Sequence, residues 1–434
     1  MDYQVSKSRE AEIGLEVFYT TTSGTGGRLR KVPEDFVVEE ISKYPNRSED
    51  GKYTIANVTS TNWEMNRLVR MLSRSLMISR SRIGFAGTKD KRAVTKQLMS
   101  FEAPIEEVRS LRMHQVTVSD AYRARKHITI GDLVGNSFTL RIRDCAIKGE
   151  ELETTAQATA NILRKLDGFP NFFGVQRFGA LRPVTHLVGK HIVKGDFERA
   201  VMVYVANPSE NEDEETQRVR RELGRSMDFK SAMATYPKKL SFERMVIAHL
   251  AENEGDYAGA IGSLPPNLQM MFVHAYQSHL FNKMLSQRIR KGLPLNRSLI
   301  GDVILPADRN GVPDHDVHIR VKEENIDLVE RQMAERKAFV SGLLFGSESE
   351  FADGEAGAIE KEIVDAEDIS REDFIIPEIS ECSSKGSRRE LLGRFKDLTI
   401  RTEDDSLVLS FSLDKGCYAT SLLREFMKAD VMDY

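Results

Sequence analysis

Apolar residues recur along the chain with both of the spacings that mark regular secondary structure. They alternate with polar residues over 36–41 and 138–142, which is the pattern of half-buried strands. Over 64–76 they recur every three to four positions, which predicts an amphipathic helix with arginines on its exposed side. We expect the polar stretch 57–62 to be a loop that provides the cap of this helix. The mixture of elements indicates an α+β fold.

Turn residues and the same two spacings predict the remaining elements. Short strands are expected at residues 83–86, 115–118, 127–130, 301–305, 318–321 and 407–413. Helices are expected at residues 151–166, 185–193, 196–205 and 268–289, and after residues 416–420. We expect 207–215 to be a boundary or exposed loop and the acidic stretch 348–372 to be exposed. The sheet should be mixed and largely antiparallel, flanked by helices.

Within this pattern, the stretch from Ile83 to Gln97 places one carboxylate among cations. The apolar run ends at Gly87, and Asp90 follows with Lys89, Lys91, Arg92 and Lys96 within six positions. Because opposite charges favour the charged form of a carboxylate, we expect Asp90 to be ionised and to suit the role of a nucleophile or base. The alternative interpretation is that these residues form an ordinary polar loop after a strand, in which the charges are only solvated.

The charges are unevenly distributed, although the net charge of −4 argues against a uniformly basic nucleic-acid binder. Residues 64–97 contain nine cations and two acids, whereas residues 348–372 contain ten acids and two cations. This asymmetry favours a basic face for a polyanion and a solvated acidic region elsewhere. At 434 residues the chain also exceeds what one hydrophobic core usually supports, so two domains are expected.

Several classes of protein are disfavoured by the sequence. No segment approaches the roughly 20 apolar residues of a membrane helix, and residues 1–14 lack the apolar core of a signal peptide. The three cysteines are far apart and encode neither a disulfide framework nor a zinc knuckle, so a reducing cytoplasm is expected. The spacing in residues 84–89 does not fit a phosphate-binding P-loop, and the Asp and His residues of 314–318 lack the geometry of a metal site.

A second unusual stretch spans residues 170–179 and contains three phenylalanines, two glycines, two side-chain amides and an arginine. Aromatic faces stack on bases and amides read their edges, so this composition suits single-stranded nucleic acid. A glycine-bounded loop whose phenylalanines fill the core is the alternative.

Three stretches taken together resemble the signatures of the TruD-type tRNA pseudouridine synthases. They are Gly87–Ala93, Asn171–Gly179 and Gly416–Thr420, and the segments 31–40 and 276–282 are similar to further blocks of that family. The resemblance runs in order from about residue 28 to the C-terminus and is weakest over 207–225 and 346–390. At one position, Tyr418 stands where many bacterial members carry Phe.

The resemblance implies a pseudouridine synthase catalytic domain interrupted by an inserted α+β domain specific to TruD proteins. Residues 1–195 and 388–434 would form the catalytic domain, and residues 196–387 the insertion. The implied activity isomerises a uridine of tRNA, usually uridine 13 of the D arm, to pseudouridine. No step of this reaction requires a cofactor or a metal, and nothing in the sequence calls for a protein partner, so a monomer is expected.

The resemblance also assigns roles to individual residues. Asp90 would be the essential catalytic residue, acting as a nucleophile at C1′ or as a base at the 2′ position, with Lys31 as its ion-pair partner. Phe36 and Phe173 would line the uracil pocket, Tyr418 would stack on the base, and Asn171 would hydrogen-bond near it. The cations expected to bind the RNA backbone are Arg67, Arg70, Arg74, Lys89, Lys91 and Arg92. A protein that binds RNA on the same scaffold without catalysis is the alternative.

Overall fold

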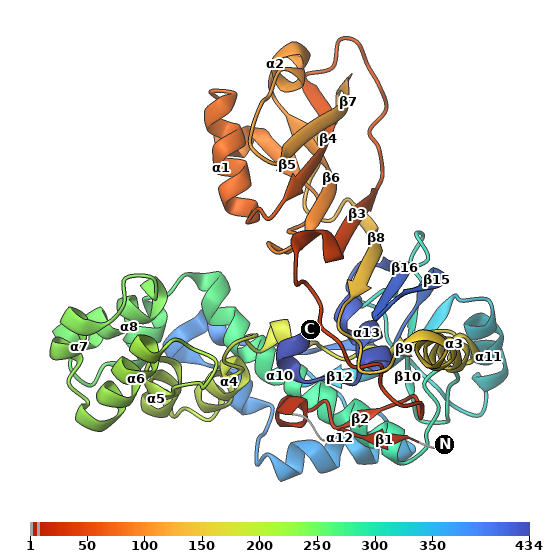
Figure 1. Cartoon of the computed structure of the whole chain (residues 1–434). Coiled ribbons are helices and arrows are strands. Elements are labelled where there is room, and N and C mark those ends of the chain that lie inside the picture. The colour runs from red at the N-terminus through yellow and green to blue at the C-terminus, as the bar shows by residue number, and fades with distance from the viewer. Residues whose placement is uncertain (1–2, 7–8) are drawn as a thin grey trace. The chain divides into compact units, whose positions relative to one another are not determined.

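The computed structural model describes residues 3–6 and 9–434, and these form two compact units (Figure 1). Unit 1 comprises the described part of residues 1–21 together with Pro170–Leu392 and Asp430–Met432. Unit 2 comprises Thr22–Phe169, Gly393–Ala429 and Asp433–Tyr434. Each unit is therefore assembled from segments that are far apart in the sequence.

Unit 2 is built on one mixed sheet with the order β15-β16-β8-β3-β6-β4-β7, and β5 also pairs with β6. Its strands are β3 (Phe36–Ser42), β4 (Tyr53–Thr61), β5 (Ile83–Phe85), β6 (Val94–Phe101), β7 (Val116–Ala124), β8 (Leu133–Ile142), β15 (Phe395–Glu403) and β16 (Ser406–Asp414). Among these described strands, β3 and β6 form the one parallel pair, with Val37 opposite Val94. The predicted α+β class with a largely antiparallel sheet is confirmed.

Helices cover this sheet because their apolar faces need a partner. In α1 (Met65–Ser75), Leu68 and Leu72 are buried in a core that includes Met99 of β6. A second core joins α3 (Gly149–Leu166) and α13 (Ala419–Met427) to side chains of β8 and β16. A short helix, α2 (Ile105–Arg109), adds Val108 to the first core. The predicted helices at 64–76 and 151–166 are confirmed.

Unit 1 combines a bundle of helices with a small sheet of order β11-β10-β12-β13. The strands are β10 (Val303–Pro306), β11 (Ile319–Arg320), β12 (Ala338–Leu344) and β13 (Ser387–Glu390), and a separate hairpin pairs β1 (Gln4–Val5) with β2 (Val17–Phe18). The helices are α4 (Thr185–Val193), α5 (Phe197–Ala206), α6 (Glu214–Ser226), α7 (Phe229–Thr235), α8 (Ser241–Glu252), α9 (Tyr257–Gly262), α10 (Pro266–Arg290), α11 (Ile326–Ala334) and α12 (Gly354–Ala366). Of these, α10 is buried on most of its surface.

Helices α4 and α10 of unit 1 cross at a very short distance. Gly189 of α4 lies so close to α10 that a Cβ atom there would meet the carbonyl oxygen of Phe272 at 2.0 Å. Glycine therefore allows the two backbones to touch. Helix α4 and the rest of the segment Pro170–Leu392 belong to unit 1, which is therefore larger than the predicted insertion, 196–387. The boundaries of that insertion stay a prediction, because a division of the chain into compact units does not show where one domain is inserted into another.

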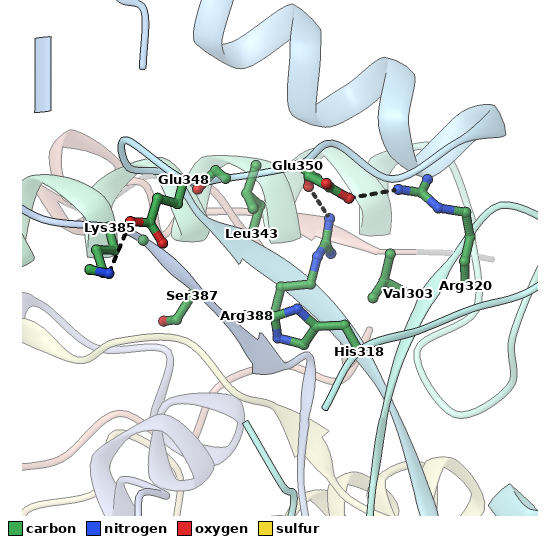
Figure 2. Close-up of a pocket in the computed structure, with 11 residues that line it drawn as sticks. Val303, His318, Arg320, Leu343, Glu348, Glu350, Lys385, Ser387 and Arg388 are labelled. Carbon is green, nitrogen blue, oxygen red and sulfur yellow. Dashed lines mark hydrogen bonds and ion pairs between the residues drawn. The ribbon is translucent and has the colours of Figure 1, made fainter. Parts of the chain in front are cut away.

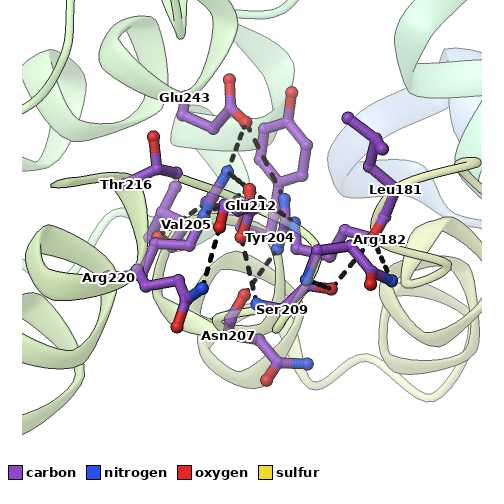
Figure 3. A network of polar contacts seen from close by, with 12 residues as sticks. Leu181, Arg182, Tyr204, Val205, Asn207, Ser209, Glu212, Thr216, Arg220 and Glu243 are labelled. Carbon is purple, nitrogen blue, oxygen red and sulfur yellow. Dashed lines mark hydrogen bonds and ion pairs between the residues drawn. The ribbon is translucent and has the colours of Figure 1, made fainter. Parts of the chain in front are cut away.

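Two arginines close the C-terminal end of α5 in unit 1 (Figure 3). Arg182 donates to the carbonyl oxygens of Val203 and Tyr204, and Arg220 donates to those of Tyr204 and Val205. The last carbonyls of a helix have no partner within it, so these guanidinium groups satisfy them. Glu212 and Glu243 pair with both arginines. The run 207–215 was expected to be a boundary or an exposed loop. Residues 207–213 lie outside helices and strands and are exposed or half-buried, and α6 begins at Glu214.

Other sequence expectations were wrong in detail. Most of the expected loop 57–62 is the end of β4, and the cap of α1 is Glu64, whose carboxylate accepts from the backbone of Asn66 and Arg67. Residues 127–130 form no strand. Part of the acidic stretch 348–372 is α12, in which Ile359 and Val364 are buried because one face packs on the helix core. No helix within the described ranges has the length and apolarity needed to cross a membrane.

Candidate active site

The parallel pairing of β3 and β6 brings two distant segments to one edge of the sheet in unit 2. Residues that precede two parallel strands emerge at the same end of those strands. The segment before β3 carries Arg30, and the loop before β6 carries Asp90. Their side chains meet: Arg30 Nη2 donates to Asp90 Oδ2 at 2.8 Å.

A buried aspartate anchors the segment that carries Arg30. The chain turns through a short 3₁₀ helix, Pro33–Asp35, in which proline at the first position has a suitable φ and lacks only an N–H that would be unsatisfied. The Asp35 carboxylate accepts from the backbone N–H of Val32 at 3.0 Å and from Arg143 Nε at 2.7 Å. Phe36 then starts β3 opposite Leu140. The turn is therefore fixed to β8.

Arg30 lies between a ring and the candidate catalytic carboxylate. Its guanidinium carbon lies 4.0 Å from the centre of the Phe36 ring, a cation–π arrangement. Burial lowers the pKa of Arg30 and Arg92 adds to this, while Asp90 acts in the opposite direction. Its buried Nε has no hydrogen-bond partner among the residues that the structure describes. The arrangement orients one face of Asp90, whose side chain is half exposed.

The predicted pairing of Lys31 with Asp90 is wrong in this structure. Lys31 Nζ instead contacts Asp144 Oδ2 at 2.8 Å and lowers the pKa of that carboxyl. The backbone has an unusual local conformation here, since Arg30 has φ of +57°, and the two successive cations contact different carboxylates. Sequence reasoning missed Arg30, although a second cation directly before Lys31 was a visible signal.

The other cations of the Asp90 loop divide into buried and exposed groups. Lys89 Nζ lies 2.6 Å from Glu40 Oε2, and both side chains are buried, at 7% and 0% exposure. Lys89 is therefore part of the interior of the loop, where its charge is balanced by Glu40. Lys91 and Arg92 are exposed. Those two fit the predicted contacts with an RNA backbone better than Lys89 does.

The basic helix α1 is connected to the Asp90 loop. The backbone N–H of Asn62, just before the helix, donates to the carbonyl oxygen of Ala93 at 2.9 Å. On the helix, Arg67, Arg70 and Arg74 are all exposed, and Arg67 lies 5.5 Å from the ring of Trp63. Unit 2 thus carries a basic surface that is linked to the loop of its candidate catalytic residue.

Tyr418 lies at the start of α13, also in unit 2. It is the N-cap residue of this helix, with extended backbone and a half-buried side chain. A partly exposed ring at a helix end is compatible with the predicted stacking role.

Asn171 and Phe173 belong to unit 1 and lie in a dense polar network. The fully buried Asn171 side chain donates to Glu390 Oε1 at 2.9 Å and accepts from Arg389 Nη2 at 2.8 Å. The guanidinium carbon of Arg389 lies 4.2 Å from the centre of the Phe173 ring. Asn282 of α10 holds the backbone of Phe173 on both sides, through Oδ1 and Nδ2. Sequence reasoning missed Arg389, Glu390 and Asn282.

A separate cavity of about 440 Å³ lies on the small sheet of unit 1 (Figure 2). Arg320, Lys385 and Arg388 line it together with Glu348 and Glu350. The two glutamates are strongly exposed, whereas Arg388 is buried and paired with Glu360 at 2.9 Å. The exposed Glu348 is itself paired with the exposed Lys385 at 2.9 Å, so the rim carries charges of both signs.

No group of three or more metal-ligating side chains occurs in the part of the chain that the structure describes. In the Asp and His run of 314–318, His315 contacts Glu390 at 3.0 Å, and His318 contacts the carbonyl oxygen of His315. These residues are thus engaged with protein groups.

Comparison with known proteins identifies the family. The family model described as tRNA pseudouridine synthase D (TruD) matches residues 12–426. The chain is 42% identical to a probable tRNA pseudouridine synthase D of Methanococcoides burtonii, over 97% of each protein, and 40% identical to one of Natronomonas pharaonis, over 97% of each. The crystal structure of a putative TruD from Methanosarcina mazei matches with a TM-score of 0.89 at 40% identity, covering 99% of this chain and 100% of that one.

The chain belongs to the TruD family. The family suggested by the five sequence blocks is confirmed, and so is the α+β fold of a pseudouridine synthase. As a TruD protein, the chain is an RNA pseudouridine synthase, an isomerase.

Proposed function

We propose that this protein isomerises uridine 13 in the D arm of tRNA to pseudouridine, with Asp90 as the catalytic carboxylate. The contact between Arg30 and Asp90 is the observation that carries the proposal. It keeps a half-exposed carboxylate in one orientation beside an aromatic ring, at the edge of a sheet that also bears a basic helix.

The reaction rearranges bonds within one nucleotide. The N1–C1′ bond of uridine breaks, the uracil turns while it is held, and a C5–C1′ bond forms. The C5 hydrogen leaves as a proton and N1 gains one, so no other reactant is consumed. Asp90 either attacks C1′ and forms an ester that is later broken, or removes the 2′ proton to give a glycal. Both routes use the carboxylate oxygens of Asp90, one of which Arg30 orients through its hydrogen bond.

The target base must leave the tRNA stack before it can react, at a cost of a few kcal/mol. In the proposal, Phe36, Phe173 and Tyr418 offset this cost by contact with the uracil. Asn171, two residues before Phe173, is proposed to lie near the bound uracil as part of the same segment. Arg67, Arg70, Arg74, Lys91 and Arg92 would bind phosphates. Action in the cytoplasm, as a monomer and without metal or cofactor, stays a prediction from the sequence.

The experiment is tritium release from tRNA labelled at C5 of uridine, with Asp90→Asn compared with wild type. We expect wild type to release tritium and Asp90→Asn to release none. Asp144→Asn is the matched control, because Asp144 is another half-exposed carboxylate of unit 2 with a cationic partner at 2.8 Å. Release by Asp90→Asn at the wild-type rate would remove Asp90 from the mechanism. A tRNA with cytidine at position 13 tests the target, and undiminished release from it would exclude uridine 13.

A further inference from the structure

The amide of Asn171 has a fixed orientation within unit 1. Its Nδ2 donates both to Glu390 Oε1 at 2.9 Å and to the carbonyl oxygen of Glu390 at 3.2 Å. Its Oδ1 accepts from Arg389 Nη2. A side-chain amide has two donor hydrogens, and both are used here. Because Asn171 is also 0% exposed, its amide supports its own segment and does not face solvent.

Glu390 is the centre of this network. One carboxylate oxygen accepts from Asn171, and the other lies 3.0 Å from His315 Nε2. Glu390 is buried, whereas the side chain of His315 is half exposed. Burial opposes the charged form of this carboxyl, but the contacts with His315 and Arg389 outweigh it and lower the pKa of Glu390. A buried carboxylate with partners on both oxygens holds those partners firmly.

Arg389 transmits the arrangement to the aromatic ring of the same segment. The residue precedes Glu390 on β13, and both side chains reach the amide of Asn171. Its guanidinium donates to Asn171 and stacks at 4.2 Å on the ring of Phe173. The guanidinium that donates to Asn171 therefore also covers one side of the Phe173 ring, which packs on Phe281 as well.

We propose that Glu390, held by His315, is a positioning residue that sets the Asn171–Phe173 segment for catalysis. This inference rests on the proposed function, in which that segment contributes to uracil binding. Glu390 acts through Asn171 and Arg389 and does not touch the reacting atoms. Loss of its charge would leave the segment folded but loosely placed, and misplacement of about 1 Å can slow an enzymatic step about a hundredfold.

The test compares four variants of the full chain for kcat and KM in the tritium-release assay. We expect Glu390→Gln to lower kcat by about tenfold or more with the KM for tRNA within about twofold. His315→Ala should lower kcat by a smaller factor, and His315→Gln, which restores a donor, should recover it. The control is Glu360→Gln, since Glu360 is another buried carboxylate of unit 1 paired with an arginine, Arg388. That variant should lose thermal stability but keep kcat.

Equal kcat in Glu390→Gln and Glu360→Gln, or no recovery by His315→Gln after a loss in His315→Ala, would overturn the proposal. If Glu390→Gln fails to fold, the pair of variants at the exposed His315 still decides it. Absence of tritium release by the wild-type protein would contradict the proposed function instead, so the two failures are distinguishable.

Discussion

Arg30 Nη2 lies 2.8 Å from Asp90 Oδ2, and the next residue in the sequence, Lys31, contacts a different carboxylate, Asp144, at the same distance. Two adjacent cations thus serve separate acids. The left-handed backbone at Arg30 separates them, and the Asp35 turn holds that backbone in place. The orientation of Asp90, the proposed catalytic carboxylate, therefore depends on a local turn as well as on a neighbouring charge.

Replacement of Arg30 and of Lys31 by methionine, an uncharged side chain of similar length, should affect kcat unequally. Arg30→Met removes the donor to Asp90, and we expect kcat for tritium release to fall by about tenfold to a hundredfold. Lys31→Met should change kcat by less than about threefold, because Lys31 is paired elsewhere. A larger loss with Lys31→Met than with Arg30→Met would restore the original assignment of Lys31.

The buried pair of Lys89 and Glu40 should matter for stability. Lys89→Met leaves the carboxylate of Glu40 unpaired at 0% exposure, which costs about 3–5 kcal/mol in buried pairs. Urea unfolding of Lys89→Met should show this loss, and the exposed Lys91→Met should stay close to wild type. The double variant Lys89→Met with Glu40→Gln should regain part of the stability, since no unpaired charge remains. Similar stability of both single variants would show that Lys89 is not buried in solution.

The exposed arginines of α1 should determine how tRNA binding depends on salt. Each phosphate contact contributes about 0.7–0.9 to the slope of log affinity against log salt concentration. Replacement of Arg67, Arg70 and Arg74 by Gln should therefore reduce the slope by about two to three. Filter binding across a salt series measures it, with the three Arg→Lys changes as the charge-preserving control. An unchanged slope would place the RNA on another surface.

Two neighbouring histidines in unit 1 should make stability depend on pH. His186 of α4 and His279 of α10 have ring centres 4.8 Å apart, and burial first, then neighbouring charges, lowers the pKa of His186 to about 3 and of His279 to about 4. The unfolded chain binds protons at these sites near pH 6.5 and the folded chain does not, so stability falls as pH drops below 6.5.

Urea unfolding at pH 7, 6 and 5 measures this dependence. The pKa of Glu367, lowered to about 2 by Lys190 and Lys283 despite its burial, affects stability only below about pH 4.5. The interval between pH 6.5 and 4.5 therefore reports on histidines whose pKa burial lowers, and these also include His191 and His274. His186→Gln with His279→Gln should make the curve less steep there, and an equally steep curve would show that these two rings are not the main source.

Helices with a clear apolar stripe were predictable from the sequence, as α1 and α3 show. Strands with polar residues were not. In β4, Thr54, Asn57 and Ser60 are buried, and in β6, Thr95, Gln97 and Ser100 are buried, because both faces of this part of the sheet are covered. Apolar alternation alone could not detect strands whose hidden positions are polar but hydrogen-bonded.

Residues of the candidate site were predictable where a sequence block carried them, as with Asp90, Asn171 and Phe173. Their partners were not. Arg30 pairs with Asp90 through the parallel alignment of β3 and β6, and Glu390 reaches Asn171 across 219 positions of sequence. Pairings of that kind depend on strand register and on the φ of one residue, and spacing along the chain contains neither.

The position of β16 has a consequence for how the protein is made. This strand lies between β15 and β8, and it pairs with eight successive residues of β8, from Gly135 to Ile142. On the ribosome, β8 therefore leaves the exit tunnel more than 260 residues before the strand that will cover it. Until then its edge is open to other strands, including those of neighbouring chains. A premature stop before Ser406 would make that exposure permanent, and such a fragment should aggregate rather than fold.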